Sequence, residues 1–436
     1  MEQLTAANFV TEEKFVNHDT SRRKSLLMIF LDPPSPPPLD LSSTKRNLPF
    51  MLENLKRYKV SVLALGNEEE EARFKQEYGS MCESIRFVNI RGTKIGRLMR
   101  HVWLGILGLS QTRCRAHGRK MQQVIDQTIR ENHFDLIHCT SSLLGFYRFP
   151  ENIPVVGDTH NVEFDLIERM YKTTRHPFLK LYTFFEHMRL KKEELKICRK
   201  FDAMVATTER DRNVWIENSP SLNVTVVENG VDKIFFDGPK NTEMEPNSMI
   251  FVGFMEYYPN HHGVRYFMDE IFPMILRERP DAKLYVVGTR PTADVLAYTS
   301  EHIEITGYVK DIRPYVARCK VFVIPLLIGG GIRGKALEAM AMRIPIVSTT
   351  IGVEGIKLVK DESVLLADTP SDFAASVVRL LDDAKLRDAI VDKAYRSVVA
   401  NYDWPAKGIK LDQLYQRVIN NRKNKKTAEI SRGVTR

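Results

Sequence analysis

The sequence contains little cysteine and no long apolar run. Its five cysteines form no CxxC pair, which argues against a disulfide framework or a zinc site and favours a reducing compartment. They are Cys82, Cys114, Cys139, Cys198 and Cys319. The first apolar run, Leu26 to Leu31, is far shorter than the about 20 residues that a membrane-spanning helix needs, and no later run reaches that length. We therefore expect a protein that is soluble or peripheral to a membrane.

Two common nucleotide-binding signatures are also missing. The chain has no GxxxxGK[ST] string, which argues against a P-loop, and no strand-linked GxGxxG, which argues against a nicotinamide enzyme. No residue cluster indicates a metal site. We therefore expect no bound cofactor and no required metal ion.

Acidic residues are outnumbered by basic ones, 55 to 64, so that the net charge is +9. This excess indicates an anionic partner: nucleic acid, anionic lipid or a phosphorylated substrate. The segment from Arg91 to Val124 contains no acidic residue. The polar residues 1–24 read as a flexible arm, and the basic residues 421–436 read as a disordered tail.

Strand-like runs alternate with helical segments through most of the chain. Seven candidate strands lie between Ser25 and Val227, and five more lie between Ser248 and Thr349. This alternation predicts an α/β protein with two mostly parallel sheets. The turn-rich piece at 228–247 separates them, so we expect one domain at 25–235 and a second, doubly wound domain at 248–400.

The strongest local signal is the string IPLLIGGGIRGKALEAMAMRIPIV, from Ile324 to Val347. A buried strand ends, three glycines follow, and a helix opens near Arg333. Consecutive glycines let backbone N–H groups approach a ligand, and the positive helix end favours an anion. The candidate anion-binding residues are Gly329, Gly330, Gly331, Arg333, Lys335 and Glu338. The alternative is a glycine-rich loop with a surface arginine and lysine.

A second polar string, DTHNVE, follows the strand-like IPVVG. Polar residues at the carboxyl end of a parallel strand lie where such folds bind ligands. Asp158 and His160 are the candidates for chemistry, with Asn161 and Glu163 beside them on an acceptor side. The alternative for Glu163 is a cap on the next helix.

Several strings together resemble one family. The segment Pro325 to Gly355 is similar to the nucleotide-binding motif of GT-B glycosyltransferases, close to glycosyltransferase family four (group 1), in the subgroup with GGGxRxKxxE. IFVGFMEYYPNHHGVRYF, from Ile250 to Phe267, resembles the opening of that family's C-terminal domain. VVENGVDKIFF, from Val226 to Phe236, resembles the connection between its domains. The resemblance covers most of residues 25 to 420.

The resemblance implies a fold and roles. Two Rossmann-like domains would face each other across a central cleft, and a helix at 401–420 would cross back to the first domain. Arg333 and Lys335 would neutralise the donor diphosphate as the leaving group gains charge, and Glu338 would bind the ribose. The backbone of Gly307, Tyr308 and Val309 would contact the base. One departure stands out: Gly330 occupies the position of a second, sugar-contacting glutamate.

On the acceptor side, the resemblance places His160 near the transferred sugar, with Asp158 orienting its ring or polarising the acceptor. Ser42 and Ser43 could meet phosphate, although a capping role for them is the favoured alternative. The basic, apolar stretch from Ile95 to Leu109 could lie on an anionic bilayer; the alternative is a core helix with a solvated basic face.

The implied function is transfer of a sugar from a nucleotide-diphosphate sugar to a saccharide or lipid-linked acceptor in polysaccharide or glycolipid synthesis, with retention of anomeric configuration. We expect a cytoplasmic protein that can lie peripherally on the inner face of the membrane, with residues 91–124 on an anionic surface and no specific nucleic acid as partner. Two alternatives stay open: a sugar-nucleotide epimerase on the same fold, and a basic nucleic-acid-binding protein, which no recognised signature supports.

Overall fold

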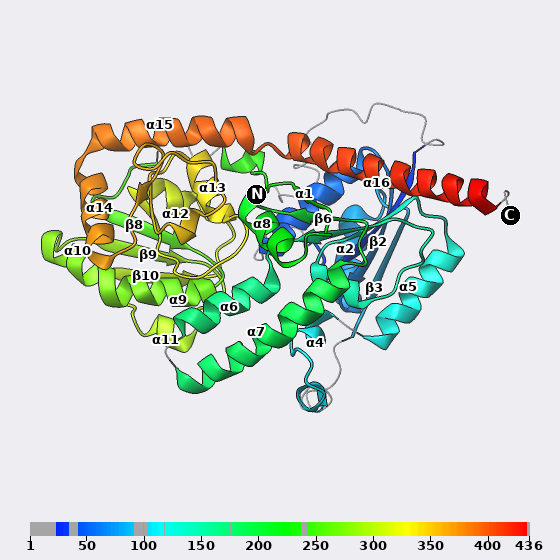
Figure 1. Cartoon of the computed structure of the whole chain (residues 1–436). Coiled ribbons are helices and arrows are strands. Elements are labelled where there is room, and N and C mark those ends of the chain that lie inside the picture. The colour runs from blue at the N-terminus through cyan, green and yellow to red at the C-terminus, as the bar shows by residue number, and fades with distance from the viewer. Residues whose placement is uncertain are drawn as a thin grey trace.

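The computed structural model describes residues 23–34, 42–90, 99, 103–116, 118–174, 176–236 and 242–433, and for residues 42–44, 233 and 425–433 it describes the backbone alone. These residues form two α/β domains that lie next to each other (Figure 1). Within these ranges, no helix is both long and apolar enough to cross a membrane.

The N-terminal domain is built on a seven-stranded parallel sheet with the order β3-β2-β1-β4-β5-β6-β7. Its strands are β1 (Ser25–Phe30), β2 (Lys59–Leu65), β3 (Ser84–Val88), β4 (Leu136–Cys139), β5 (Val155–Thr159), β6 (Ala203–Ala206) and β7 (Val224–Val226). Because side chains alternate along a strand, Leu27 and Ile29 face one core, while Leu26 and Met28 face the other. The seven predicted strands are confirmed, but β5 continues past the predicted end at Gly157, so Asp158 lies within it.

Helices cover both faces of this sheet (Figure 1). One core is closed by α1 (Ser42–Leu55) and α2 (Glu68–Tyr78). The other is closed by α5 (Arg119–Glu131), α7 (Pro177–Cys198) and α8 (Glu209–Asn218), together with the 3-10 helix η3 (Ser142–Phe146). The short α4 (Arg113–Ala116) and α6 (Glu163–Thr173), which packs along α7, complete this side.

The C-terminal domain contains a six-stranded parallel sheet with the order β10-β9-β8-β11-β12-β13. Its strands are β8 (Ser248–Val252), β9 (Lys283–Val287), β10 (Ile303–Gly307), β11 (Val321–Ile324), β12 (Ile346–Ser348) and β13 (Leu365–Leu366). Its helices include α9 (Tyr258–Tyr266), α10 (Phe272–Glu278), α11 (Ala293–Leu296), α12 (Arg313–Arg318), α13 (Gly334–Ala341) and α14 (Pro370–Asp382). The five predicted strands are present, and the two-residue β13 was missed.

The helical stretch that follows β8 is not one continuous α-helix. The helical stretch begins at Tyr258 because Pro259, in the first turn, needs no hydrogen-bonded N–H there. A π-helical turn, Phe267–Ile271, interrupts it before α10, whose own first turn contains Pro273.

The chain returns to the N-terminal domain through two long helices, α15 (Ala384–Asn401) and α16 (Trp404–Gly433) (Figure 1). The ring of Trp404 meets that of Phe50 in α1 edge-on at 5.1 Å between centroids, and both lie in the N-terminal core. This confirms the two Rossmann-like sheets and the returning helix of the GT-B arrangement. The expected disordered tail is instead helical to Gly433, because the segment has no helix-breaking residue before that glycine, and Arg422 pairs with Asp202 at 3.4 Å.

Candidate active site

The predicted glycine loop lies at the boundary between the two domains. After β11 the chain passes through Gly329, Gly330 and Gly331 before α13 begins. Gly331 has a φ of +65°, and a Cβ atom added there would lie 2.3 Å from the carbonyl oxygen of His160 in the N-terminal domain. Only glycine allows this backbone angle and this close approach. The loop therefore touches the acceptor-side string directly.

Arg333 stands immediately before α13 and is 8% exposed. Its guanidinium donates hydrogen bonds to the carbonyl oxygens of Gly330, Gly331 (2.5 Å) and Ile351 (3.0 Å). Its Nε is buried and has no hydrogen-bond partner. Burial lowers the pKa of Arg333, but a guanidinium stays charged in proteins. Arg333 thus holds the loop in shape and places a fixed positive charge at the start of the helix.

Lys335 lies in the first turn of α13 and points into the same region. Its Nζ donates to Asn260 Oδ1 at 2.8 Å and lies 4.3 Å from the centre of the Phe251 ring. Burial, and then the nearby charge of Lys45, lower the pKa of Lys335 to about 7. The amine is therefore only partly protonated at pH 7 and would become fully protonated when an anion binds beside it.

Glu338, on the next turn of α13, is buried and forms an ion pair with Lys45 of α1, across the domain boundary. Its second oxygen, Oε2, is buried and accepts no hydrogen bond from the described residues. Burial, and then the charge of Glu338, raise the pKa of Asp232 to about 6. A carboxylate with one free oxygen is suited to accept a hydrogen bond from a hydroxyl group of a ligand.

Asp158 is held by a buried ion pair that the sequence did not predict. Arg46 of α1 donates to both carboxylate oxygens, at 3.0 Å from Nε to Oδ2 and 2.9 Å from Nη2 to Oδ1. Burial acts to raise the pKa of Asp158, but the charge and hydrogen bonds of Arg46 outweigh it, and the pKa lies below its usual value. Among the described residues, Arg46 is the one hydrogen-bond donor to this carboxylate, so Asp158 does not hold the His160 ring, which instead forms a hydrogen bond with the backbone of Thr140.

His160 follows β5 and faces the glycine loop. Burial lowers its pKa to about 4, against the opposing effect of Asp158, so the ring is neutral at pH 7. Its Nε2 is buried and has no hydrogen-bond partner within the part of the chain that the structure describes. The neighbouring Asn161 bridges the domains: with its amide nitrogen turned toward the loop, it donates to Gly330 O at 2.8 Å.

The remaining predicted residues lie in or beside α6, α1 and β10. Glu163 is the first residue of α6 and lies 3.9 Å from Arg115, and burial raises its pKa. Ser42 and Ser43 open α1, but their side chains lie outside the described residues. Gly307 ends β10 with a φ of +66°, and Tyr308 and Val309 follow it. No contact in the structure tests their predicted role at the base.

Sequence reasoning missed the residues that join the domains. Arg169 of α6 donates to Gly329 O at 2.8 Å and pairs with Glu354 at 3.0 Å. Arg210 pairs with Asp165 at 2.6 Å and lies 3.9 Å from Glu354. Glu354 belongs to the string that carries the family resemblance and offered a signal, whereas the two arginines follow no spacing rule.

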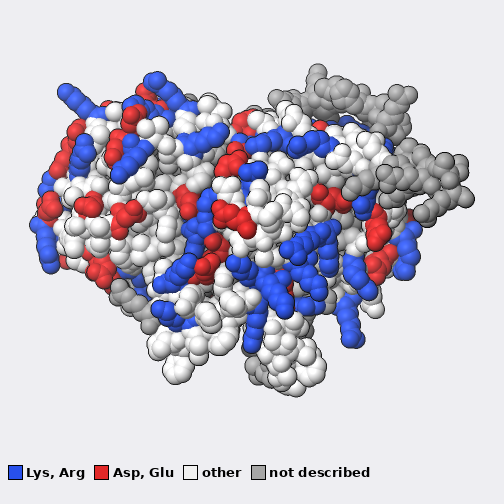
Figure 2. Space-filling model, viewed as in Figure 1, with Lys and Arg blue, Asp and Glu red and all other residues white. Residues whose placement is uncertain are grey.

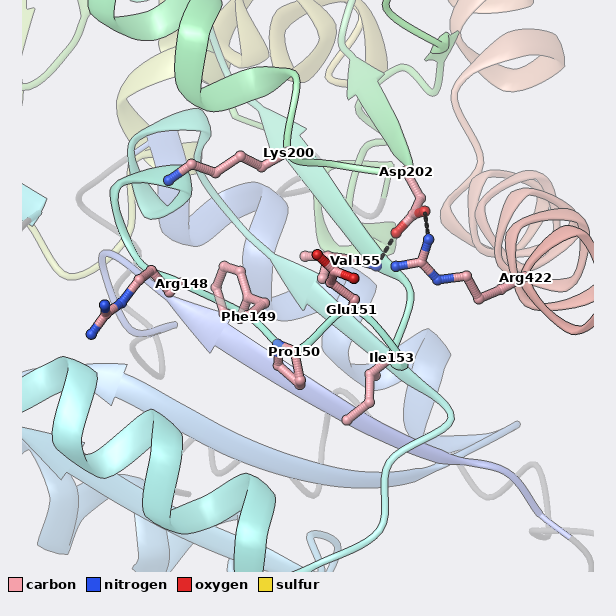
Figure 3. A pocket seen from close by; sticks show the side chains of 9 residues that line it. All are labelled: Arg148, Phe149, Pro150, Glu151, Ile153, Val155, Lys200, Asp202 and Arg422. Atoms are coloured by element: carbon pink, nitrogen blue, oxygen red, sulfur yellow. Dashed lines mark hydrogen bonds and ion pairs between the residues drawn. The ribbon is translucent and has the colours of Figure 1, made fainter. Parts of the chain in front are cut away.

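A cavity of about 390 Å³ lies elsewhere in the N-terminal domain (Figure 3). Its lining includes Val155, which starts β5, and Asp202, which precedes β6. Asp158 and His160 lie at the opposite, carboxyl end of β5. The cavity is therefore separate from the candidate site.

Comparison with known proteins identifies the family of this chain. Residues 55–233 match the model of "Glycosyltransferase Family 4", and residues 246–383 match "Glycosyl transferases group 1". An uncharacterized 44.6 kDa protein in the cps region of Klebsiella pneumoniae is 23% identical over 259 residues, which cover 56% of this chain and 64% of that protein. An uncharacterized glycosyltransferase of Methanocaldococcus jannaschii is 28% identical over 212 residues, covering 43% and 53%. The matches thus span less than two thirds of both curated relatives.

Two solved structures share the whole fold. Sucrose-phosphate synthase from Thermosynechococcus elongatus has a TM-score of 0.64 at 13% identity, covering 91% of this chain and 100% of that one. Anabaena HepE in complex with UDP-glucose has a TM-score of 0.64 at 12% identity, covering 90% and 99%. With both of its domains matched and its fold shared, the chain belongs to the group 1 and family 4 glycosyltransferases of the GT-B fold.

Proposed function

We propose that this protein transfers a sugar from a nucleotide-diphosphate sugar to a saccharide or lipid-linked acceptor. The observation that carries the proposal is the meeting of two polar sets at the domain boundary. One is the glycine loop with Arg333, Lys335 and Glu338, and the other is the string that holds His160. The K. pneumoniae relative, encoded in a cps region, supports a role in cell-surface polysaccharide or glycolipid synthesis.

The donor diphosphate would bind at the start of α13. Backbone N–H groups of the loop, the helix end and Lys335 would face its negative charge, and Arg333 would add a fixed positive field. The ribose hydroxyls would donate to the free Oε2 of Glu338. Because these cations are in place before the reaction, they stabilise the diphosphate as it leaves with the electrons of the broken glycosidic bond.

His160 would lie against the sugar as a neutral hydrogen-bonding group. A ring with a pKa of about 4 is a weak base at pH 7, and therefore we assign it to orientation of the sugar rather than to proton removal. We propose that anomeric configuration is retained. Since HepE binds UDP-glucose, a UDP-sugar is the first donor to test.

We also propose that transfer needs no metal ion, because the fixed charge of Arg333 and the amine of Lys335, which becomes fully charged when the diphosphate binds, would supply positive charge at the leaving group. Incubation with EDTA should leave the rate unchanged. A rate that EDTA abolishes and Mg²⁺ or Mn²⁺ restores would contradict this part of the proposal.

The direct test is a thermal-shift panel of UDP-, GDP-, ADP- and CMP-sugars, followed by transfer assays with the stabilising donor. Lys335→Met and Arg333→Ala should both lose the thermal shift and at least about 100-fold in transfer, as expected for groups that stabilise charge in the transition state. Arg396→Ala, on the exposed surface of α15, is the matched control and should behave as wild type. Unchanged turnover in both site variants would refute the diphosphate assignment.

A further inference from the structure

One surface of the N-terminal domain exposes large apolar side chains from two separate segments. They are Phe178, Leu181, Tyr182, Phe185 and Met188 of α7, and Trp103, Ile106 and Leu107 of the segment 103–107. We call this set the apolar platform. Phe178 is 79% exposed, Ile106 is 72% exposed and Trp103 is 60% exposed. Soluble proteins rarely leave so many large apolar groups together in water, so the platform indicates an interaction surface.

Helix α7 is apolar on two sides, and only one of them packs against the protein. Thr183, His187 and Leu190 are buried toward α6 and the sheet. The exposed members of the platform recur at spacings of three and four residues, from Phe178 to Met188, and so form one stripe along the helix. A helix that served the core alone would carry polar residues on this outer stripe.

Residues 110–112, which follow the segment 103–107, are tied to α7 by a buried carboxylate. Glu186 accepts hydrogen bonds from Ser110 Oγ at 2.6 Å, from the backbone nitrogen of Gln111 at 2.9 Å and from that of Thr112 at 2.9 Å. Figure 1 accordingly shows the short helix of residues 103–106 and the N-terminal half of α7 along the same lower edge of the molecule. Figure 2 shows white protrusions at this edge, with blue Lys and Arg side chains beside them.

Within residues 176–192 and 103–120, the exposed charged side chains have one sign. Residues 176–192 contain a single acid, the buried Glu186, and residues 103–120 contain none. The exposed basic residues of these two segments are Lys180, Lys192, Arg115, Arg119 and Lys120. Aromatic and aliphatic side chains bordered by Lys and Arg match the boundary between acyl chains and anionic headgroups. A second copy of this surface would instead bring like charges together, since a twofold interface pairs a patch with itself.

We propose that the apolar platform docks on an anionic lipid bilayer, with the side chains of α7 and of residues 103–107 inserted and the basic residues on the headgroups. The sequence indicated a membrane role for 91–124 but not for α7, and residues 91–98, 100–102 and 117 lie outside the described part. Arg115, which pairs with Glu163, joins this surface to the acceptor-side string. If the proposed function holds, docking brings a lipid-linked acceptor toward His160, but docking itself does not depend on that activity.

The test is flotation of the full chain with phosphatidylcholine vesicles and with mixed phosphatidylcholine–phosphatidylglycerol vesicles. Wild type should float with the anionic vesicles only, and less at high salt. Phe178→Ser/Phe185→Ser and Trp103→Ser/Ile106→Ser should each weaken partitioning by at least about tenfold, because each variant removes two inserted side chains. Val399→Ser/Ile409→Ser, which changes apolar residues of α15 and α16 that are 51% and 49% exposed, should float as wild type.

Two further measurements distinguish a loss of membrane binding from a loss of the fold. Near-ultraviolet circular dichroism and the nucleotide-sugar thermal shift should be unchanged in the α7 variant, which would show that its fold and donor site are intact. Flotation that is equal with neutral vesicles, or equal in the platform variants, would overturn the proposal. A third result would also overturn it: light scattering that shows a wild-type dimer and monomeric platform variants, together with no vesicle binding. The platform would then bind a second copy of the chain.

Discussion

The buried pair between Arg46 and Asp158 gives the sharpest test of how the acceptor side is built. Both side chains are essentially without solvent exposure, at 0% and 1%. Arg46 is also fixed by a 2.6 Å hydrogen bond from its Nη1 to Asn229 and by the Phe50 ring, 4.6 Å away, so it cannot turn to water. Removing one partner of such a pair leaves a buried, uncompensated charge, which costs about 3–5 kcal/mol.

We therefore expect Asp158→Asn and Arg46→Met to destabilise the N-terminal domain by about that amount. The double variant Arg46→Met/Asp158→Asn leaves no unpaired charge and should recover most of the loss. Urea unfolding can be followed by the fluorescence of Trp215 and Trp404, which lie in the two cores on either side of this sheet. For a slope of about 1–3 kcal/mol/M, each single variant should lower the midpoint by about 1 M or more.

The pH dependence has a defined sign. Because the pKa of Asp158 is lowered in the folded protein, the pair stabilises the fold at neutral pH, and this contribution is lost as the pH falls through that pKa. The difference between wild type and Asp158→Asn should therefore shrink in acid. If Asp158→Asn keeps full stability at pH 7 but loses transfer activity, the ion-pair argument fails and the direct catalytic role predicted from the sequence stands.

Three predictions concern the donor side. Since the pKa of Lys335 is about 7, UDP-glucose should bind more tightly with proton uptake as the pH falls from about 8 to about 6, and Lys335→Arg should flatten this dependence in calorimetry. Glu338→Gln should weaken UDP binding by about 10-fold or more, because hydrogen bonds to a charged group contribute about 1.5–3 kcal/mol, whereas binding of 2′,3′-dideoxy-UDP should change little; equal losses for both ligands would count against the ribose role. Gly331→Ala should reduce transfer by at least about tenfold and also lower the unfolding midpoint, since the left-handed backbone costs about 1–2 kcal/mol and the new Cβ meets His160 O; wild-type turnover would show that the loop tolerates displacement.

The fold was largely predictable because most of its elements are long or strongly patterned. The run SLLMIF of β1 is buried on both faces, which is the pattern of a central parallel strand. Elements without such a signal were missed. Strand β13 has two residues, and the π-helical turn Phe267–Ile271 interrupts an apolar segment whose composition is that of an ordinary helix. The helical extension to Gly433 is a polar segment, so apolar periodicity gave no sign of it.

The candidate site was predictable only where its residues are neighbours in sequence. Arg333, Lys335 and Glu338 belong to one strand–loop–helix unit, so local spacing places them together. Their partners come from distant segments: Lys45 is 293 residues from Glu338, and Asn260 is 75 residues from Lys335. The first pair depends on how the domains meet and the second on how α9 and α13 pack within the C-terminal domain, and no periodicity in the sequence encodes either contact.

Gly330 shows how the contact between domains accounts for a departure that the sequence left unexplained. A Cβ atom at this position would lie 3.1 Å from the side-chain amide of Asn161, so a side chain here would need Asn161 of the N-terminal domain to shift. Asn161 in turn can donate to the Gly330 carbonyl oxygen. The glutamate that the resemblance leads one to expect is thus replaced by a glycine and an asparagine from opposite domains, which brings a polar amide to the same edge of the site. The two residues should therefore be treated as one feature of the acceptor-facing wall, rather than as a missing donor-side carboxylate.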